Sequence, residues 1–239
     1  MNTTTDRPQY LVCEQKWVYV LLMAAAGMMG AYTFNLRGGV FCNAQTANFV
    51  MMAVAFGQGR WMNACYYLIP VFAYLSGAFL SEILPSPVKR LGFLRWDTYL
   101  IGFEILVLFV IGLIPLSWPD HLVQVLVNFI ASMQYNTFRQ ARGIPMATTF
   151  CTNHLRQIGI ALAKLLRKGD RSMIQREAAH AAMLLAFVAG GILLTAACPP
   201  LKERAIWLAL VPLAILFITM THADLTTEHE YLGDKPSGH

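Results

Sequence analysis

The chain has 239 residues, of which 56% are hydrophobic and only 13% are charged, and its formal net charge is +5. An ordinary globular protein has roughly 25% charged residues, and a soluble fold of this length lacks the interior to bury so much apolar surface. The composition therefore excludes a soluble, disordered or disulfide-stapled secreted protein and predicts a polytopic membrane protein. In such a protein excess Lys and Arg marks the cytoplasmic loops, so no nucleic-acid partner is expected.

Six apolar runs are long enough to cross a bilayer as helices. None of them contains more than one charged or histidine residue, and the five tryptophans lie at or near their ends, where such rings prefer the headgroup layer. The predicted spans are 17–36, 61–80, 98–119, 121–138, 178–201 and 205–222.

Two further stretches, 38–59 and 143–166, are apolar but polar in their first halves. If both are re-entrant, thirteen of the 18 Lys and Arg residues lie on the side of the two termini and four lie on the other side. If both cross fully, the flanking charges divide nine against eight. Because cytoplasmic loops are rich in Lys and Arg, we predict an all-α protein with six spans, two re-entrant segments and cytoplasmic termini.

The two re-entrant segments resemble each other. Arg37-Gly38 matches Arg142-Gly143, and the run 46–48 (Thr-Ala-Asn) matches 152–154 (Thr-Asn-His). Each segment follows one span and precedes two, so three crossings per half would invert the second half, as in many transporters. Chance matches in an apolar chain are the alternative. The predicted divisions are a cytoplasmic tail at 1–16, repeats at 17–116 and 117–222, and a cytoplasmic tail at 223–239.

Two sequence blocks carry a family resemblance. The run 30–48 and the runs 133–139 and 147–156 resemble the conserved blocks of the YoaK-type family, a domain-of-unknown-function group of small bacterial inner-membrane proteins. The usual Thr-Gly-Asn of that family lacks its glycine at both places here. The resemblance implies a multi-pass, transporter-like protein of the bacterial cytoplasmic membrane, with no established substrate.

Polar side chains are costly in the membrane interior and therefore mark candidate sites. Neutral amides and hydroxyls can hydrogen-bond to a desolvated solute, although the same groups could instead cap broken helices. Asn128 lies in a continuous span and is expected to contribute less to binding. The candidate substrate-binding residues are Asn43, Gln45, Thr46, Asn48, Gln134, Asn136, Thr149, Thr152, Asn153 and His154.

Two residues are candidates for proton coupling. Glu104 is the only carboxylate well inside a predicted span, and it could exchange protons, pair with a cytoplasmic arginine or remain neutral. His154 is the second candidate, with a hydrogen-bonded packing role as its alternative. Downstream, Arg156, Lys164 and Arg167 fall near one helical face, which indicates a basic surface facing anionic lipid, or an anion-attracting mouth.

The sequence contains no recognisable enzyme motif. It has no HExxH, no paired intramembrane aspartates, no Walker loop and no dinucleotide fingerprint. We therefore expect no enzymatic activity, no cofactor and no metal. The first hypothesis is a transporter or flippase for a small organic solute, with the lipid bilayer and a homodimer as its other partners. A pore-type channel and a non-transporting accessory or scaffold protein are the alternatives.

Overall fold

The computed structural model describes residues 9–168, 172–234 and 236, and most of them are helical. Parts of the two expected tails and the basic residue Arg171 lie outside the described residues. The α-helices are α1 (Lys16–Leu36), α2 (Gln45–Gly57), α3 (Trp61–Tyr66), α4 (Leu68–Ile83), α5 (Pro85–Lys89), α6 (Trp96–Ile111), α7 (Asp120–Thr137), α8 (Cys151–Lys168), α9 (Ser172–Leu201) and α10 (Leu210–Leu225). The shorter elements are the 3₁₀ helices η1 (Val12–Glu14), η2 (Lys202–Ala209) and η3 (His229–Tyr231), and an antiparallel pair of strands, β1 (Gln140–Ala141) and β2 (Ile144–Pro145).

Each of the six predicted spans contains a helix, so the all-helical class is confirmed. Three helical stretches in the described part of the chain are long and apolar enough to cross a membrane: Lys16–Leu36, Trp61–Lys89 and Arg176–Leu225. The last stretch includes most of α9, and all of η2 and α10. Helix α6 ends at Ile111, well before the predicted end of its span at position 119. The number of spans stays a prediction.

The two Arg-Gly pairs that the sequence analysis matched both turn the backbone. Gly38 follows α1 with φ of 81°, and Gly143 follows α7 with φ of 72°. This left-handed region is readily adopted only by glycine, because a Cβ would meet the backbone. The two turns differ, however, because Gly38 follows α1 directly, whereas Gly143 lies between β1 and β2 beside Arg142, which also has a positive φ of 48°.

Helices α1 and α9 run parallel and touch through their backbones. Gly190 packs against the backbone of Ala24, and Gly27 packs against the backbone of α9. Farther along both helices, Asn35 Nδ2 donates a hydrogen bond of 3.1 Å to Thr195 Oγ1. In lipid, apolar side chains gain no hydrophobic free energy by moving from the acyl chains into a helix interface. Helices associate there through close van der Waals packing, which small residues allow.

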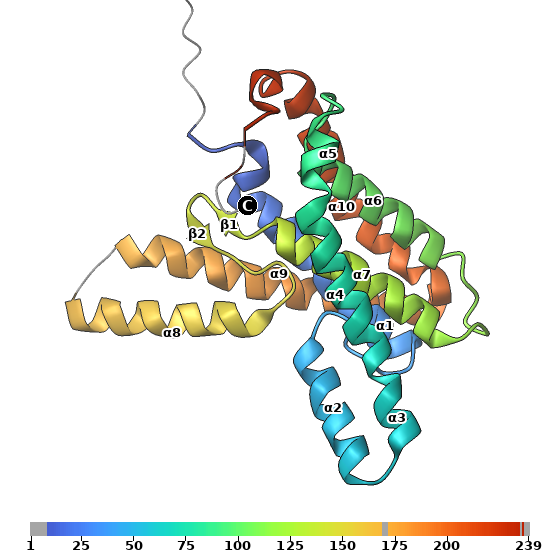
Figure 1. Ribbon diagram of the computed structural model, residues 1–239. Coiled ribbons are helices and arrows are strands. Elements are labelled where there is room, and N and C mark those ends of the chain that lie inside the picture. The colour runs from blue at the N-terminus through green and yellow to red at the C-terminus, as the bar shows by residue number, and fades with distance from the viewer. Residues whose placement is uncertain (1–8, 169–171, 235, 237–239) are drawn as a thin grey trace, which may run out of the picture.

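Helices α4 and α7 form a second parallel pair. Gly77 packs against Ser132 and the backbone of α7, and Asn136 Nδ2 donates to Ser81 Oγ at 2.9 Å. Helix α6 lies antiparallel to α10, with Gly102 against the ring of Phe217. These pairs form one helical body, from which the α2–α3 hairpin projects in one direction and α8 with the first part of α9 in another (Figure 1).

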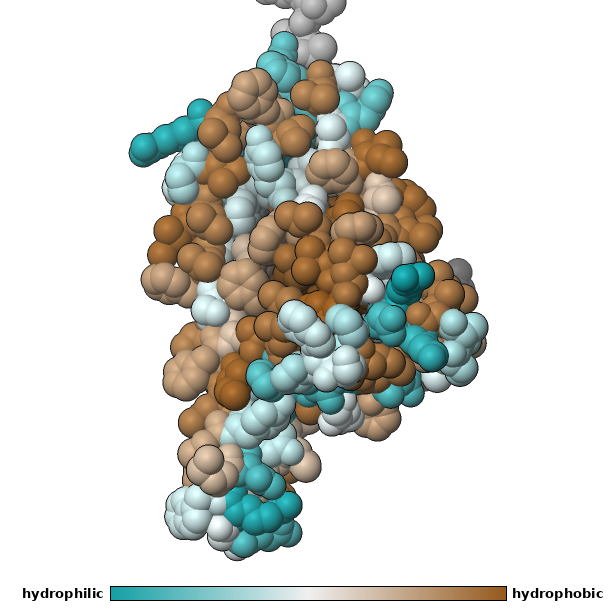
Figure 2. Space-filling model, turned by 90° about the vertical axis from the view of Figure 1, so that its right-hand side faces the viewer, coloured by the Kyte–Doolittle hydropathy of each residue, from teal (hydrophilic) through white to brown (hydrophobic). Residues whose placement is uncertain are grey.

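The outside of the body is apolar. Figure 2 shows hydrophobic residues over much of one face, whereas the tip of the α2–α3 hairpin at the bottom is hydrophilic. Large side chains on three different helices are more than half exposed, among them Phe72, Leu106 and Ile218. A soluble monomer rarely exposes apolar patches of this extent, so these helices suit a lipid environment.

We predict that Gly190→Ala destabilises the protein and that Gly191→Ala does not. An added Cβ at Gly190 would collide with the carbonyl oxygen of Ala24, whereas at Gly191 the nearest atom would be 3.6 Å away. Overpacking of this kind costs about 1–3 kcal/mol, and the intrinsic helix preference for Ala over Gly applies to both variants. Thermal unfolding in detergent measures the difference, and equal melting temperatures would contradict the close crossing.

Candidate functional site

The first candidate re-entrant segment, 38–59, is called the first loop from here on. It brings the chain from the end of α1 back to the centres of two helices. Asn43 Nδ2 donates a hydrogen bond of 3.3 Å to the carbonyl of Ala26, the central residue of α1. Gln45 Nε2 donates to Asn128 Oδ1, at the centre of α7. Asn43 and Asn128 are buried. Helix α2 therefore begins deep inside the helical body.

Further amides extend this contact into a network. Gln45 Oε1 accepts from Asn48 Nδ2 at 3.0 Å, and Asn128 Nδ2 donates to the carbonyl of Gln124 at 2.7 Å. The Gln124 side chain in turn donates to the carbonyl of Arg37 at 2.8 Å. Thr46 is exposed and lies outside the network. The first loop is thus held by hydrogen bonds within the protein.

The second candidate re-entrant segment, 143–166, is called the second loop from here on. Its polar groups are less completely satisfied by hydrogen bonds within the described structure. Gln134 Nε2 donates to the carbonyl of Thr148 at 3.4 Å. Three buried polar atoms beside this contact, Gln134 Oε1, Thr148 Oγ1 and Thr149 Oγ1, find no hydrogen-bond partner among the described residues. A buried polar atom without a partner costs about 1–3 kcal/mol and commonly marks the place of a water molecule or ligand. This loop therefore has hydrogen-bonding capacity for a solute.

The histidine of the second loop is fixed at both ring nitrogens. His154 Nε2 lies 2.7 Å from the carbonyl of Ala147, and its Nδ1 lies 2.9 Å from Nδ1 of His180 on α9. A carbonyl accepts only, so Nε2 donates to Ala147, and in neutral His154 the Nδ1 then accepts from His180. Of the neighbouring candidates, Thr152 is exposed, and half-buried Asn153 accepts a hydrogen bond from Arg156 at 3.2 Å.

Helix α7 contacts both loops. Asn128 bonds to the first loop and Gln134 to the second, and their separation in sequence corresponds to about 9 Å along the helix axis. The structure thus places Asn128 in contact with the first loop, and the expectation that it contributes less to binding stays a prediction. Asn128 and Gln124 lie one helical turn apart, and this spacing of two amides in an apolar helix is the signal that the sequence analysis missed. His180 gave no comparable signal, because its partner His154 is 26 positions away.

Glu104 lies at the centre of α6 and is fully buried. Neither of its carboxylate oxygens has a hydrogen-bond partner in the described part of the chain. The alternative in which a cytoplasmic arginine pairs with this carboxylate therefore finds no support.

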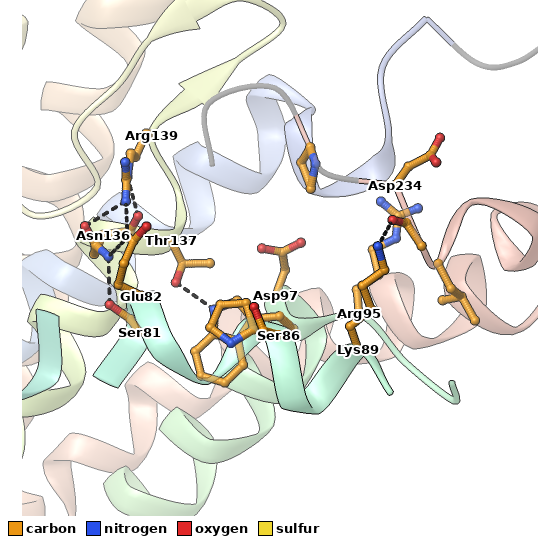
Figure 3. Close-up of a pocket in the computed structure, with 15 residues that line it drawn as sticks. Ser81, Glu82, Ser86, Lys89, Arg95, Asp97, Asn136, Thr137, Arg139 and Asp234 are labelled. Atoms are coloured by element: carbon orange, nitrogen blue, oxygen red, sulfur yellow. Dashed lines mark hydrogen bonds and ion pairs between the residues drawn. The ribbon is translucent and has the colours of Figure 1, made fainter. Parts of the chain in front are cut away.

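A pocket of about 350 Å³ lies where the ends of α4 and α7 meet α5, the start of α6 and the segment after η3. Asn136 is the sequence-predicted candidate that lines it. Figure 3 shows Asn136 beside Glu82 and Arg139 at one end, where Arg139 pairs with Glu82 at 3.0 Å, and Lys89 and Arg95 at the other end. Trp96 Nε1 donates to Thr137 Oγ1 at 3.0 Å between the two ends. The pocket thus combines charges of both signs with an aromatic ring.

A buried ionic cluster adjoins this pocket. Arg95 Nε lies 3.3 Å from Asp224 Oδ1, and Arg95 Nη2 lies 2.8 Å from Glu228 Oε2. Glu228 Oε1 accepts a hydrogen bond of 2.7 Å from the backbone N–H of Val12. Burial raises the pKa of Glu228 above its ordinary value, because the loss of water outweighs the attraction of Arg95. The cluster joins η1, the start of α6 and the end of α10.

Comparison with known proteins gives the family. A family model described as "Protein of unknown function (DUF1275)" matches residues 18–219. The chain belongs to this family. It is also 20% identical over 215 residues to the UPF0700 transmembrane protein YoaK of Bacillus subtilis (strain 168), which covers 88% of this chain and 94% of that protein. No solved structure matches the chain.

The resemblance to the YoaK-type family is confirmed, and this member of the DUF1275 family is a membrane protein. The matched range contains both loops, Glu104 and the residues of α7. It also contains Arg95, but it ends before Asp224 and Glu228.

We predict that Arg95→Met strongly destabilises this DUF1275 protein. Removing the cation leaves two buried carboxylates without their partner, which costs about 3–5 kcal/mol. Combining the change with Asp224→Asn and Glu228→Gln should restore part of the loss. Arg139→Gln is the matched control, because its pair with Glu82 is exposed and worth at most about 1 kcal/mol. Similar melting temperatures for Arg95→Met and Arg139→Gln would refute a stabilising cluster.

Proposed function

We propose that this DUF1275-family protein is a transporter or flippase for a small organic solute, which binds near the middle of the membrane between the two loops. The observation that carries the proposal is the meeting of both loops on α7, one at Asn128 and the other at Gln134. Irregular backbone at membrane depth is tolerated where it is buried in protein or lines a cavity. The unpartnered polar atoms beside Gln134 then serve as the solute's hydrogen-bonding groups.

The pairing of the helices supports an inverted repeat of six spans and two re-entrant segments. If α1, α2, α4 and α6 are matched with α7, α8, α9 and α10, the contact of α1 with α9 corresponds to that of α7 with α4. The contact of α2 with α4 likewise corresponds to that of α8 with α9, and the contact of α1 with α10 to that of α7 with α6. All of these helix pairs are in contact. Inverted repeats with broken segments at the midplane are typical of secondary transporters.

The other candidate residues take subsidiary roles in this proposal. Glu104, which is not engaged in a hydrogen bond in the described part of the chain, is the proton-coupling group, because an intramembrane carboxylate free of an ion pair can load and release a proton. His154, held by His180 and Ala147, is the weaker candidate. The pocket containing Asn136 is the cytoplasmic vestibule, and its charges of both signs favour a polar or zwitterionic solute.

We predict that Thr149→Val lowers solute uptake several-fold without lowering stability. The two side chains have similar shapes, and the lost hydroxyl has no partner in the described structure, so its removal leaves no protein group unsatisfied. A solute would lose one hydrogen bond, worth about 0.5–1.5 kcal/mol. Uptake of a panel of labelled polar and zwitterionic solutes into proteoliposomes, alongside thermal unfolding, measures both effects.

Thr152→Val is the matched control, because Thr152 lies on the same loop but is exposed. Loss of stability in Thr149→Val would indicate a structural role for this loop. Uptake that does not saturate and does not respond to a gradient would instead favour a pore-type channel. No uptake of any solute by the wild-type protein would favour the accessory or scaffold alternative.

Glu104→Gln should abolish the pH dependence of uptake and leave the melting temperature unchanged. Gln keeps the shape of the side chain but cannot release a proton. No ion-pair partner in the described part of the protein would be stranded by the change, so the loss of about 3–5 kcal/mol expected for a broken buried pair should not occur. Uptake measured over a range of pH together with unfolding separates the cases, and retained pH dependence would exclude Glu104 as the coupling group.

A further inference from the structure

Helix α8 presents one packed face and one exposed apolar face. Its only extensive helix contact in the described structure is with α9, beside which it projects from the body (Figure 1). His154 and Ala161 are buried, and their spacing of seven residues places them on one side of the helix. Leu155, Leu162 and Leu166 are 65%, 47% and 86% exposed, and their spacings of seven and four define a second, outward stripe.

Cationic side chains flank this leucine stripe. Arg156, Lys164 and Arg167 are exposed, and the sequence of α8 contains no acidic residue. A hollow of about 240 Å³ on this flank is lined by Ile160, Ala163, Lys164 and Arg167. Two cations beside a small apolar concavity match the phosphate and the first methylene groups of a phospholipid.

The corresponding helix of the first half lacks this chemistry. Helix α2 also exposes large apolar side chains, including Phe49, Met51 and Val54, but it contains no charged residue. The basic flank is therefore not a general property of the projecting helices. Its restriction to α8 matches the predicted topology, in which α8 follows a cytoplasmic loop and faces the leaflet that carries anionic lipid.

We infer that α8 binds anionic phospholipid of the cytoplasmic leaflet at its C-terminal end. The lipid phosphate sits between Lys164 and Arg167, and the acyl chains run along Leu155, Leu162 and Leu166. Basic side chains at the membrane surface attract anionic headgroups in this way, while the apolar side chains of the same helix lie below the headgroups. This inference does not depend on the proposed transport activity.

The test uses the full-length protein in a mild non-ionic detergent, with phosphatidylglycerol or phosphatidylcholine of identical acyl chains added. Native mass spectrometry counts the bound lipids, and thermal unfolding reports the stabilisation. We expect phosphatidylglycerol to bind more tightly than phosphatidylcholine. The double change Lys164→Gln and Arg167→Gln should weaken phosphatidylglycerol binding about tenfold, because each basic residue near an anionic headgroup contributes to affinity.

Arg60→Gln with Arg204→Gln is the matched control, because it removes two exposed cations from other parts of the surface and should leave phosphatidylglycerol binding unchanged. Leu166→Gln should weaken the binding of both lipids. Equal binding of the two lipids by the wild-type protein, or equal losses in the two double variants, would overturn the inference. Stabilisation by inorganic phosphate alone would also overturn it, since the occupant would then be a free anion.

A measurement on the wild-type protein tests the inference even if the variants fold poorly. Binding of phosphatidylglycerol to the wild-type protein should weaken as salt concentration rises, because both cations are exposed and therefore screened. Binding that is independent of salt would exclude the two cations as the headgroup site.

Discussion

The structure depends on two places where helix backbones touch. Gly27 and Gly190 let α1 and α9 come together, and Gly77 does the same for α4 and α7. Between helices surrounded by lipid, close packing replaces the hydrophobic effect as the main source of attraction. With α1 and α7 fixed in this way, Asn43 reaches the centre of one helix and Gln45 the centre of the other.

The two loops that meet α7 differ in how their polar groups are satisfied. The amides of the first loop bond to each other and to α1 and α7, so their hydrogen-bonding groups are engaged within the protein. The second loop leaves two hydroxyls and one amide oxygen unbonded in the described structure. Hydrogen bonds to the solute would then come mainly from the second loop.

The sequence predicted the features that depend on short segments. The apolar runs marked the helices, and the two Arg-Gly pairs that it matched as a repeat both contain a glycine with positive φ. It missed the contact between Asn128 and Gln45, because the two residues are 83 positions apart and the spacing of Asn128 and Gln124 by one helical turn does not name a partner. The early end of α6 was missed because residues 112–119 remain largely apolar after the helix stops. The pocket could not be predicted, since distant segments of the chain contribute to its lining.

The cluster around Arg95 has a consequence for the order in which the protein is made. Val12 and Glu228, which it joins, are 216 positions apart, so the ribosome must synthesise α10 before the cluster can close. Until then the start of α6 holds an arginine without its carboxylate partners, a state that is unfavourable away from water. The last helix to emerge therefore completes the end of the body formed by η1 and α6. A nascent chain that stops before Asp224 lacks both carboxylates, so its Arg95 has neither of the ion pairs of the finished protein.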